Sequence, residues 1–123
     1  MNSRRRLLWV DGLGALAAGI VVLLIKGWLS QWYALPEQLL FFTGVVNLIY
    51  ASYSIPLAAR AIRPMSWILF LVVANLTWAI VCLTLAFSYS ATASLFGMAH
   101  LIGEGLYVGG LGCLEYRWRE DLR

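Results

Sequence analysis

Charged residues are scarce in this sequence. They make up only 12% of its 123 residues, whereas 62% are hydrophobic and the mean hydropathy is +0.80. A soluble domain carries about 25% charged residues, and one with this composition would expose most of its apolar side chains to water. A hydrocarbon solvent removes that conflict. The composition therefore predicts an all-α, polytopic membrane protein, and it excludes the basic groove that a nucleic-acid partner would need.

Cysteine and histidine are also scarce, which limits the chemistry available. Cys82 and Cys113 form no Cys-x-x-Cys pair. Their expected depths differ by about 20 Å along the membrane normal, whereas a disulfide needs Cα atoms within about 7 Å. His100 is the single histidine, so a metal ion or haem would depend on that imidazole unless a dimer doubled it. We therefore predict no catalytic residues, no metal ligands and no cofactor, and the sequence disfavours an enzyme.

Four long apolar runs follow one another along the chain. They cover residues 7–29, 38–59, 65–87 and 93–116. Each is close to the ~20 residues that an α-helix needs to cross ~30 Å of hydrocarbon. The segments between them are short, and none has the composition of a linker. The sequence predicts a single domain over residues 1–123, a bundle of four transmembrane helices.

The arginines fall on one side of this four-helix arrangement, and only Lys26 lies near the opposite face. They precede the first run (Arg4, Arg5, Arg6), separate the second from the third (Arg60, Arg63) and follow the fourth (Arg117, Arg119, Arg123). The positive-inside rule then places both termini in the cytoplasm, and in a bacterium the membrane would be the inner one. Residues 3–8 imitate a twin-arginine export signal. Because Asp11 interrupts the apolar stretch that follows, we expect 7–29 to be a retained anchor.

Polar side chains lie near the centre of three of the predicted helices. On a count of ~1.5 Å per residue, Asn47, Asn75 and Glu104 fall within roughly 3 Å of the midplane. Each belongs to a stripe on one helix face: Thr43, Asn47, Tyr50 and Ser54; Asn75, Trp78 and Cys82; Gly97, His100, Glu104 and Tyr107. Turned into the bundle, the stripes predict a ligand- or proton-binding site. Its members would be Glu104, His100, Asn47, Asn75, Tyr50, Tyr107 and Trp78.

The predicted binding site depends mainly on Glu104. An ionised carboxylate at the midplane costs several kcal/mol unless it has a partner. His100 is one turn away on the same face and can share a proton with it. The alternative is structural: a protonated carboxyl locked to Asn47 or Asn75, with both asparagines serving as interhelical contacts worth about 0.6 to 2 kcal/mol each.

The remaining acidic residues of the runs are expected near the membrane surface. Asp11 lies roughly 10 Å or more from the midplane, on its cytoplasmic side. We expect it to pair with Arg60 or Arg63. Glu115 is expected to pair with Arg119, four residues later on the same helix. Both carboxylates would then act as interfacial anchors rather than as parts of the central site.

Gly105, Gly109 and Gly112 share one face of the fourth predicted helix. Small residues at this spacing let another helix approach closely. The first predicted helix offers a matching surface of small residues at 14–18 and 15–19. The glycines therefore predict either helix packing within the monomer or the seam of a homodimer.

Two functions fit these observations. The leading hypothesis is a small membrane protein whose bundle interior binds a proton, an ion or a small polar or amphipathic molecule, with transport as its natural consequence. The alternative is a non-catalytic accessory or assembly subunit that docks to a larger membrane complex through the glycine face. The lipid bilayer is a partner in both, and a homodimer or larger complex is compatible with either.

Overall fold

A computed structural model of the chain describes residues 6–60 and 62–122. Over this range the chain forms six helices: α1 (Arg6–Leu24), α2 (Lys26–Tyr33), α3 (Glu37–Ala59), α4 (Met65–Ser88), α5 (Leu95–Arg117) and α6 (Arg119–Leu122). The described residues are thus all-helical, as predicted. Arg4, Arg5 and Arg123 of the predicted charge pattern lie outside the described residues.

Three of the described helices, α1, α3 and α4, are long and apolar enough to cross a membrane. This finding rests on their length and composition, and it supports the prediction of a membrane protein with transmembrane helices. α5 is of similar length, 23 residues, but His100, Glu104 and six glycines lower its hydropathy.

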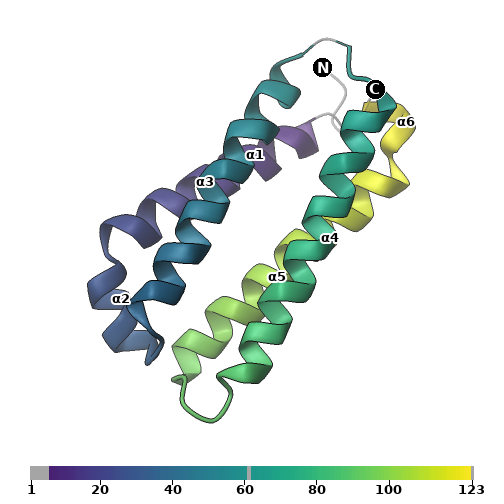
Figure 1. Cartoon of the computed structure of the whole chain (residues 1–123). Helices are drawn as coiled ribbons and strands as arrows, with labels where there is room; N and C mark the ends of the chain where they lie inside the picture. Colours follow the sequence, from purple (N-terminus) through teal and green to yellow (C-terminus); the bar gives the residue numbers. More distant parts are fainter. Residues whose placement is uncertain (1–5, 61, 123) are drawn as a thin grey trace.

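The long helices form two antiparallel pairs, α1 with α3 and α4 with α5 (Figure 1). The start of α1, the end of α3, the start of α4 and α6 lie at one end of the bundle, which we call the terminal end. The other end, which we call the α2 end, holds α2 and the α4–α5 connection. Close contacts are concentrated within each pair, so the space between the pairs is where an interior site can form.

The first predicted helix, 7–29, is not continuous. α1 ends at Leu24, and α2 begins at Lys26 after Ile25 leaves the helical conformation (φ −120°, ψ 24°). The break separates the apolar sequence of α1 from the polar and aromatic sequence of α2. It turns the chain at the α2 end and brings Tyr33 towards the bundle interior, where it packs against buried leucines.

Glycines allow the close approach of α1 and α3. A Cβ atom on Gly19 would lie 2.8 Å from Leu48 Cδ2 and 3.0 Å from the carbonyl oxygen of Gly44. A Cβ atom on Gly12 would lie 2.7 Å from Ile55 Cγ1. Real Cβ atoms do not approach side chains and backbone this closely, so any larger residue would push the two helices apart.

The predicted glycine face of α5 packs on α4 of the same chain. Added Cβ atoms on Gly105, Gly109 and Gly112 would lie 3.1, 3.3 and 3.1 Å from side chains of α4. This arrangement is the intramolecular one of the two predicted alternatives. The small residues of α1 do not fill this face, because Gly12 and Gly19 meet α3 instead.

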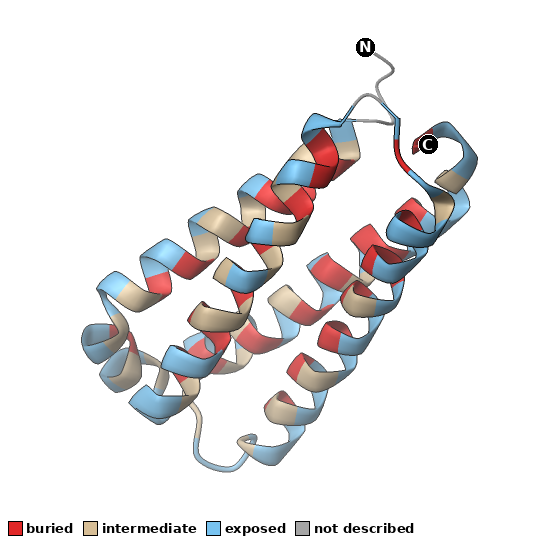
Figure 2. Ribbon diagram, turned by 45° about the horizontal axis from the view of Figure 1, so that its top comes forward, coloured by how far each residue is buried: buried red, intermediate tan, exposed pale blue. Residues whose placement is uncertain are grey.

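The outer faces of the bundle are apolar. Buried residues line the inner faces, and exposed ones face outward (Figure 2). Among the exposed side chains, Phe41, Phe70, Ile80 and Leu106 are between 54% and 67% exposed. A surface that presents many large apolar side chains suits lipid better than water.

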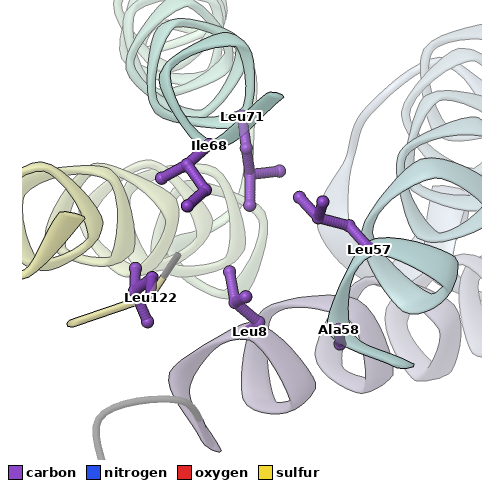
Figure 3. Close-up of a cluster of buried hydrophobic side chains, with 6 residues drawn as sticks. All are labelled: Leu8, Leu57, Ala58, Ile68, Leu71 and Leu122. Atoms are coloured by element: carbon purple, nitrogen blue, oxygen red, sulfur yellow. The ribbon is translucent and has the colours of Figure 1, made fainter. Parts of the chain in front are cut away.

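An apolar cluster closes the terminal end of the bundle (Figure 3). Its members come from four helices and are at most 2% exposed: Leu8, Leu57, Ala58, Ile68, Leu71 and Leu122. Leu122 reaches the cluster because α6 folds back over the ends of α4 and α5. The cluster packs α6 against the ends of the long helices.

Candidate functional site

The Glu104 carboxyl is held by side chains from two other helices. Asn47 of α3 donates from Nδ2 to Glu104 Oε1 at 2.8 Å, and Trp78 of α4 donates from Nε1 to the same oxygen at 3.2 Å. Asn47 Nδ2 also donates to the carbonyl oxygen of Thr43 at 2.9 Å, which fixes the orientation of the amide. Two donors on one carboxyl oxygen stabilise its negative charge in a site where the side chain is only 11% exposed.

His100 faces the second oxygen of this carboxyl. Its Nε2 lies 3.4 Å from Glu104 Oε2, one helical turn away on α5, as predicted from the sequence spacing. The distance is that of an ion pair, but its geometry leaves Oε2 without a hydrogen bond among the described residues. The contact is therefore mainly electrostatic, and movement of one proton between the two side chains changes the charge on each.

Tyr33 is a part of this site that was not predicted. Its hydroxyl lies 3.3 Å from His100 Nδ1, and the two ring centroids are 5.2 Å apart. Burial raises the pKa of Tyr33, so its hydroxyl keeps its proton and can donate it in a hydrogen bond to Nδ1. A neutral imidazole that accepts this bond at Nδ1 carries its proton on Nε2, the nitrogen that faces Glu104. The break at Ile25 brings Tyr33 here, and the polar, aromatic composition of 26–33 is the sequence signal for it.

Asn75 belongs to a second polar cluster and does not bond to Glu104. Its Nδ2 donates to Asp11 Oδ2 at 2.9 Å and to Glu115 Oε1 at 2.6 Å. The three side chains are at most 2% exposed and come from α1, α4 and α5. We call them the Asp11–Asn75–Glu115 cluster.

The predicted ion pairs of the two acidic residues are therefore wrong. Arg63, the expected partner of Asp11, donates to the carbonyl oxygens of Leu57, Ala58 and Leu122 at the terminal end. Arg60 donates to the carbonyl oxygen of Ile62 at 3.4 Å and stacks on Trp67, and Arg119 donates to the carbonyl oxygen of Tyr116 at 2.7 Å. Arginines at helix ends satisfy carbonyl groups there, while the carboxyls turn into the bundle.

Helix direction explains the division between the two sites. Side chains on a helix lean towards its N-terminus. α4 begins at the terminal end, so Asn75 leans that way, towards Asp11. α3 and α5 begin at the α2 end, so Asn47 and Glu104 both lean away from Asn75. A count of depth along helix axes ignores this offset and places the three polar groups at one level.

A cavity of about 50 Å³ lies between the two helix pairs and borders both polar sites. The residues that line it come from α1, α3, α4 and α5: Asp11, Gly14, Ala15, Ala18, Val46, Asn47, Tyr50, Asn75, Trp78, Glu104, Tyr107 and Val108. All the predicted site residues except His100 are among them. A space of this size accommodates about three or four water molecules.

Two tyrosines complete the wall of the cavity. The Tyr50 hydroxyl donates to the carbonyl oxygen of Leu71 at 3.4 Å, and the Tyr107 hydroxyl donates to that of Val10 at 3.3 Å. A Cβ atom on Gly14 would lie 2.7 Å from the Tyr107 hydroxyl, so a larger residue there would displace the end of the tyrosine side chain. Tyr107 therefore bridges α5 and α1 across the space between the pairs.

Within residues 6–60 and 62–122, no three or more His, Cys, Asp or Glu side chains form a group able to hold a metal ion. Cys82 is buried, Cys113 is exposed, and both are free thiols. The chemistry on offer is that of carboxyl, imidazole, amide and phenol groups around a small cavity. No protein-family model, no curated protein and no solved structure matches the chain, so this chemistry is inferred from the geometry of the site.

Proposed function

We propose that the chain is an integral membrane protein with four spans, α1, α3, α4 and α5, whose interior binds a proton at Glu104 and passes it across the bilayer. α5 is included because it packs along α4, turns Glu104 inward and exposes apolar residues such as Leu106 outward. With four spans, the arginines of the sequence all lie on one side of the membrane. The positive-inside rule makes that side the cytoplasmic one, so both termini would be cytoplasmic.

The observation that carries the proton-binding role is the environment of the Glu104 carboxyl. Oε1 accepts hydrogen bonds from Asn47 and Trp78, while Oε2 faces an imidazole that can take or give a proton. The donors stabilise the carboxylate, and His100 stabilises it further when protonated. The low exposure of Glu104 favours the neutral acid. These opposing effects act on the same carboxyl, which is the reason for proposing it as the proton-binding group.

The size of the cavity favours a proton or a small ion over a larger ligand. About 50 Å³ holds a few water molecules, whereas pockets for drug-sized molecules measure about 300 to 1,000 Å³. A short chain of water beside a carboxyl conducts protons by breaking one O–H bond as the next one forms. Transport of protons is the function that this arrangement supports best.

Proton flux in proteoliposomes tests the proposal. A K⁺ diffusion potential drives protons inward, and a pH-sensitive dye inside the vesicles reports them. Glu104→Gln keeps the shape and the contact with Asn47 but cannot titrate, so its flux is expected to fall to that of protein-free vesicles. Glu37→Gln is the matched control, because the Glu37 side chain is 55% exposed at the start of α3 and its carboxyl lies 3.7 Å from Lys26 rather than in the bundle interior. Equal flux in the wild type and Glu104→Gln, with both proteins folded, would overturn the proposal.

The number of spans is tested separately by topology. Four spans put α6 and the start of α1 on the same side of the membrane, whereas three spans put them on opposite sides. We expect reporters fused to the two termini to be cytoplasmic, and a cysteine at Ser90, in the α4–α5 connection, to be labelled from the other side. Termini on opposite sides would exclude the four-span arrangement.

The accessory-subunit hypothesis gains no support from the glycine face. Gly105, Gly109 and Gly112 meet side chains of α4 within the same chain, so that surface is already occupied. An accessory role would have to use another surface, and normal flux in Glu104→Gln would be its first supporting result.

A further inference from the structure

The Asp11–Asn75–Glu115 cluster brings two carboxyls onto a single amide group. Asp11 Oδ2 and Glu115 Oε1 both accept hydrogen bonds from Asn75 Nδ2, at 2.9 and 2.6 Å. Asp11 is 2% exposed, and Asn75 and Glu115 are 0% exposed. Because both carboxyl oxygens lie within 2.9 Å of the same nitrogen atom, the two carboxyls are adjacent. The cluster therefore has four carboxyl oxygens and two amide hydrogens to serve them.

Two buried polar atoms of the cluster have no hydrogen-bond partner. They are Asn75 Oδ1 and Glu115 Oε2, and neither is accessible to solvent. A buried acceptor without a donor is costly, and two adjacent carboxylates away from water repel each other strongly. One additional hydrogen, placed on either carboxyl, supplies a donor and removes one of the two charges. Two adjacent buried carboxyls characteristically hold one proton between them.

Within residues 6–60 and 62–122, no ion pair joins a basic side chain to Asp11 or Glu115. α4 contributes the neutral amide of Asn75. Tyr50 of α3 and Tyr107 of α5 line the same cavity, and their hydroxyls donate to main-chain carbonyl oxygens. A proton added to the cluster would lower its negative charge and supply the missing donor.

We propose that Asp11 and Glu115 share one proton and form a second proton-binding site, across the cavity from Glu104. The site is independent of Glu104, and the cavity borders Asp11 and Asn75 on one side and Glu104 on the other. Protons reach it through the cavity, which Asp11 and Asn75 line: an O–H bond of a cavity water breaks as one forms on the carboxyl, and that water regains a proton from its neighbour.

Infrared spectroscopy of the protein in membranes tests this inference, since a protonated carboxyl has its own C=O stretching band. The Glu104→Gln background removes the central site. In that background we expect one protonated carboxyl at neutral pH. Adding Asp11→Asn or Glu115→Gln should let the remaining acid ionise at lower pH, because its like-charged neighbour is gone. Adding both should abolish the band.

Isotope labelling in the same background provides a second test. Labelling the Glu104→Gln protein with ¹³C at aspartate carboxyls, or at glutamate carboxyls, should shift part of the band in each case if the proton is shared. A shift with one label alone would assign the proton to one residue and overturn sharing. A band of two protonated carboxyls, or none, in Glu104→Gln would also overturn it. Proton flux is measured separately, so failure of the Glu104 proposal and failure of this one are distinguishable.

Discussion

Replacing Asn75 by leucine isolates the hydrogen bonds that hold the Asp11–Asn75–Glu115 cluster together. The two side chains have similar size and shape, so the change removes the amide with little effect on packing. Asn75 Nδ2 supplies one hydrogen to Asp11 and one to Glu115, at 2.9 and 2.6 Å. After substitution both carboxyls remain buried at the junction of three helices without that donor.

The expected cost follows from the charge of the acceptors. An interhelical hydrogen bond between neutral groups in a membrane protein contributes about 0.6 kcal/mol, with a maximum near 1.7. A hydrogen bond to a charged group contributes about 1.5 to 3 kcal/mol. With one proton shared, one acceptor is charged and one neutral, so Asn75→Leu should lower the free energy of unfolding by about 2 to 5 kcal/mol at neutral pH. Once acidification protonates both carboxyls, the loss should fall to about 1 to 3 kcal/mol.

Unfolding in mixed micelles of mild and denaturing detergent, followed by tryptophan fluorescence, measures this difference. Gln38→Leu is the control, because it makes the same kind of change from an amide to leucine at an exposed position, at the start of α3. It should change the free energy of unfolding by no more than about 0.5 kcal/mol. A loss below about 1 kcal/mol for Asn75→Leu at neutral pH, or a loss that does not change on acidification, would refute the reasoning.

Two further substitutions test how the helices are held. Gly112→Leu should separate α5 from α4 and lower the free energy of unfolding by about 1 to 3 kcal/mol, because an added Cβ would already lie 3.1 Å from a side chain of α4. Gly110→Leu is the matched control. A Cβ atom at Gly110 meets nothing within 4 Å, so this change should be nearly neutral. Leu122→Ala should cost about 2 to 5 kcal/mol in the same assay, since Leu122 is 0% exposed in the terminal-end cluster; a cost near zero would show that α6 does not close this end.

The helical fold follows largely from the sequence because lipid imposes simple rules. Apolar runs of about 20 residues have to be helical in hydrocarbon, where every backbone polar group needs an internal partner. The pairing of α4 with α5 was one of two alternatives that the glycines at 105, 109 and 112 left open, and steric contact decides between them. The break at Ile25 was not predicted, because 7–29 reads as one apolar run until its last few residues.

The central site was predicted in part. The spacing of His100 and Glu104 on one helix indicates their contact, and that contact is found. The partners of Asp11, Asn75 and Glu115 were assigned wrongly, because depth along a helix axis says nothing about the direction in which a side chain leans. Arg63 was also considered as a partner of Asp11, whereas it donates to carbonyl oxygens at the ends of α3 and α6.

The two helix pairs are joined by interactions of a different kind from those within each pair. Within a pair, glycines such as Gly19 and Gly112 bring helices close enough that any added side chain would clash. Between pairs, Asn47 bonds to Glu104, Asp11 is linked through Asn75 to α4, and Tyr107 bonds to the backbone of α1. The steric packing of glycines within each pair does not depend on charge. Two of the links between the pairs end on carboxyl groups, so a change in the protonation of Asp11 or Glu104 is expected to alter the interface between the pairs.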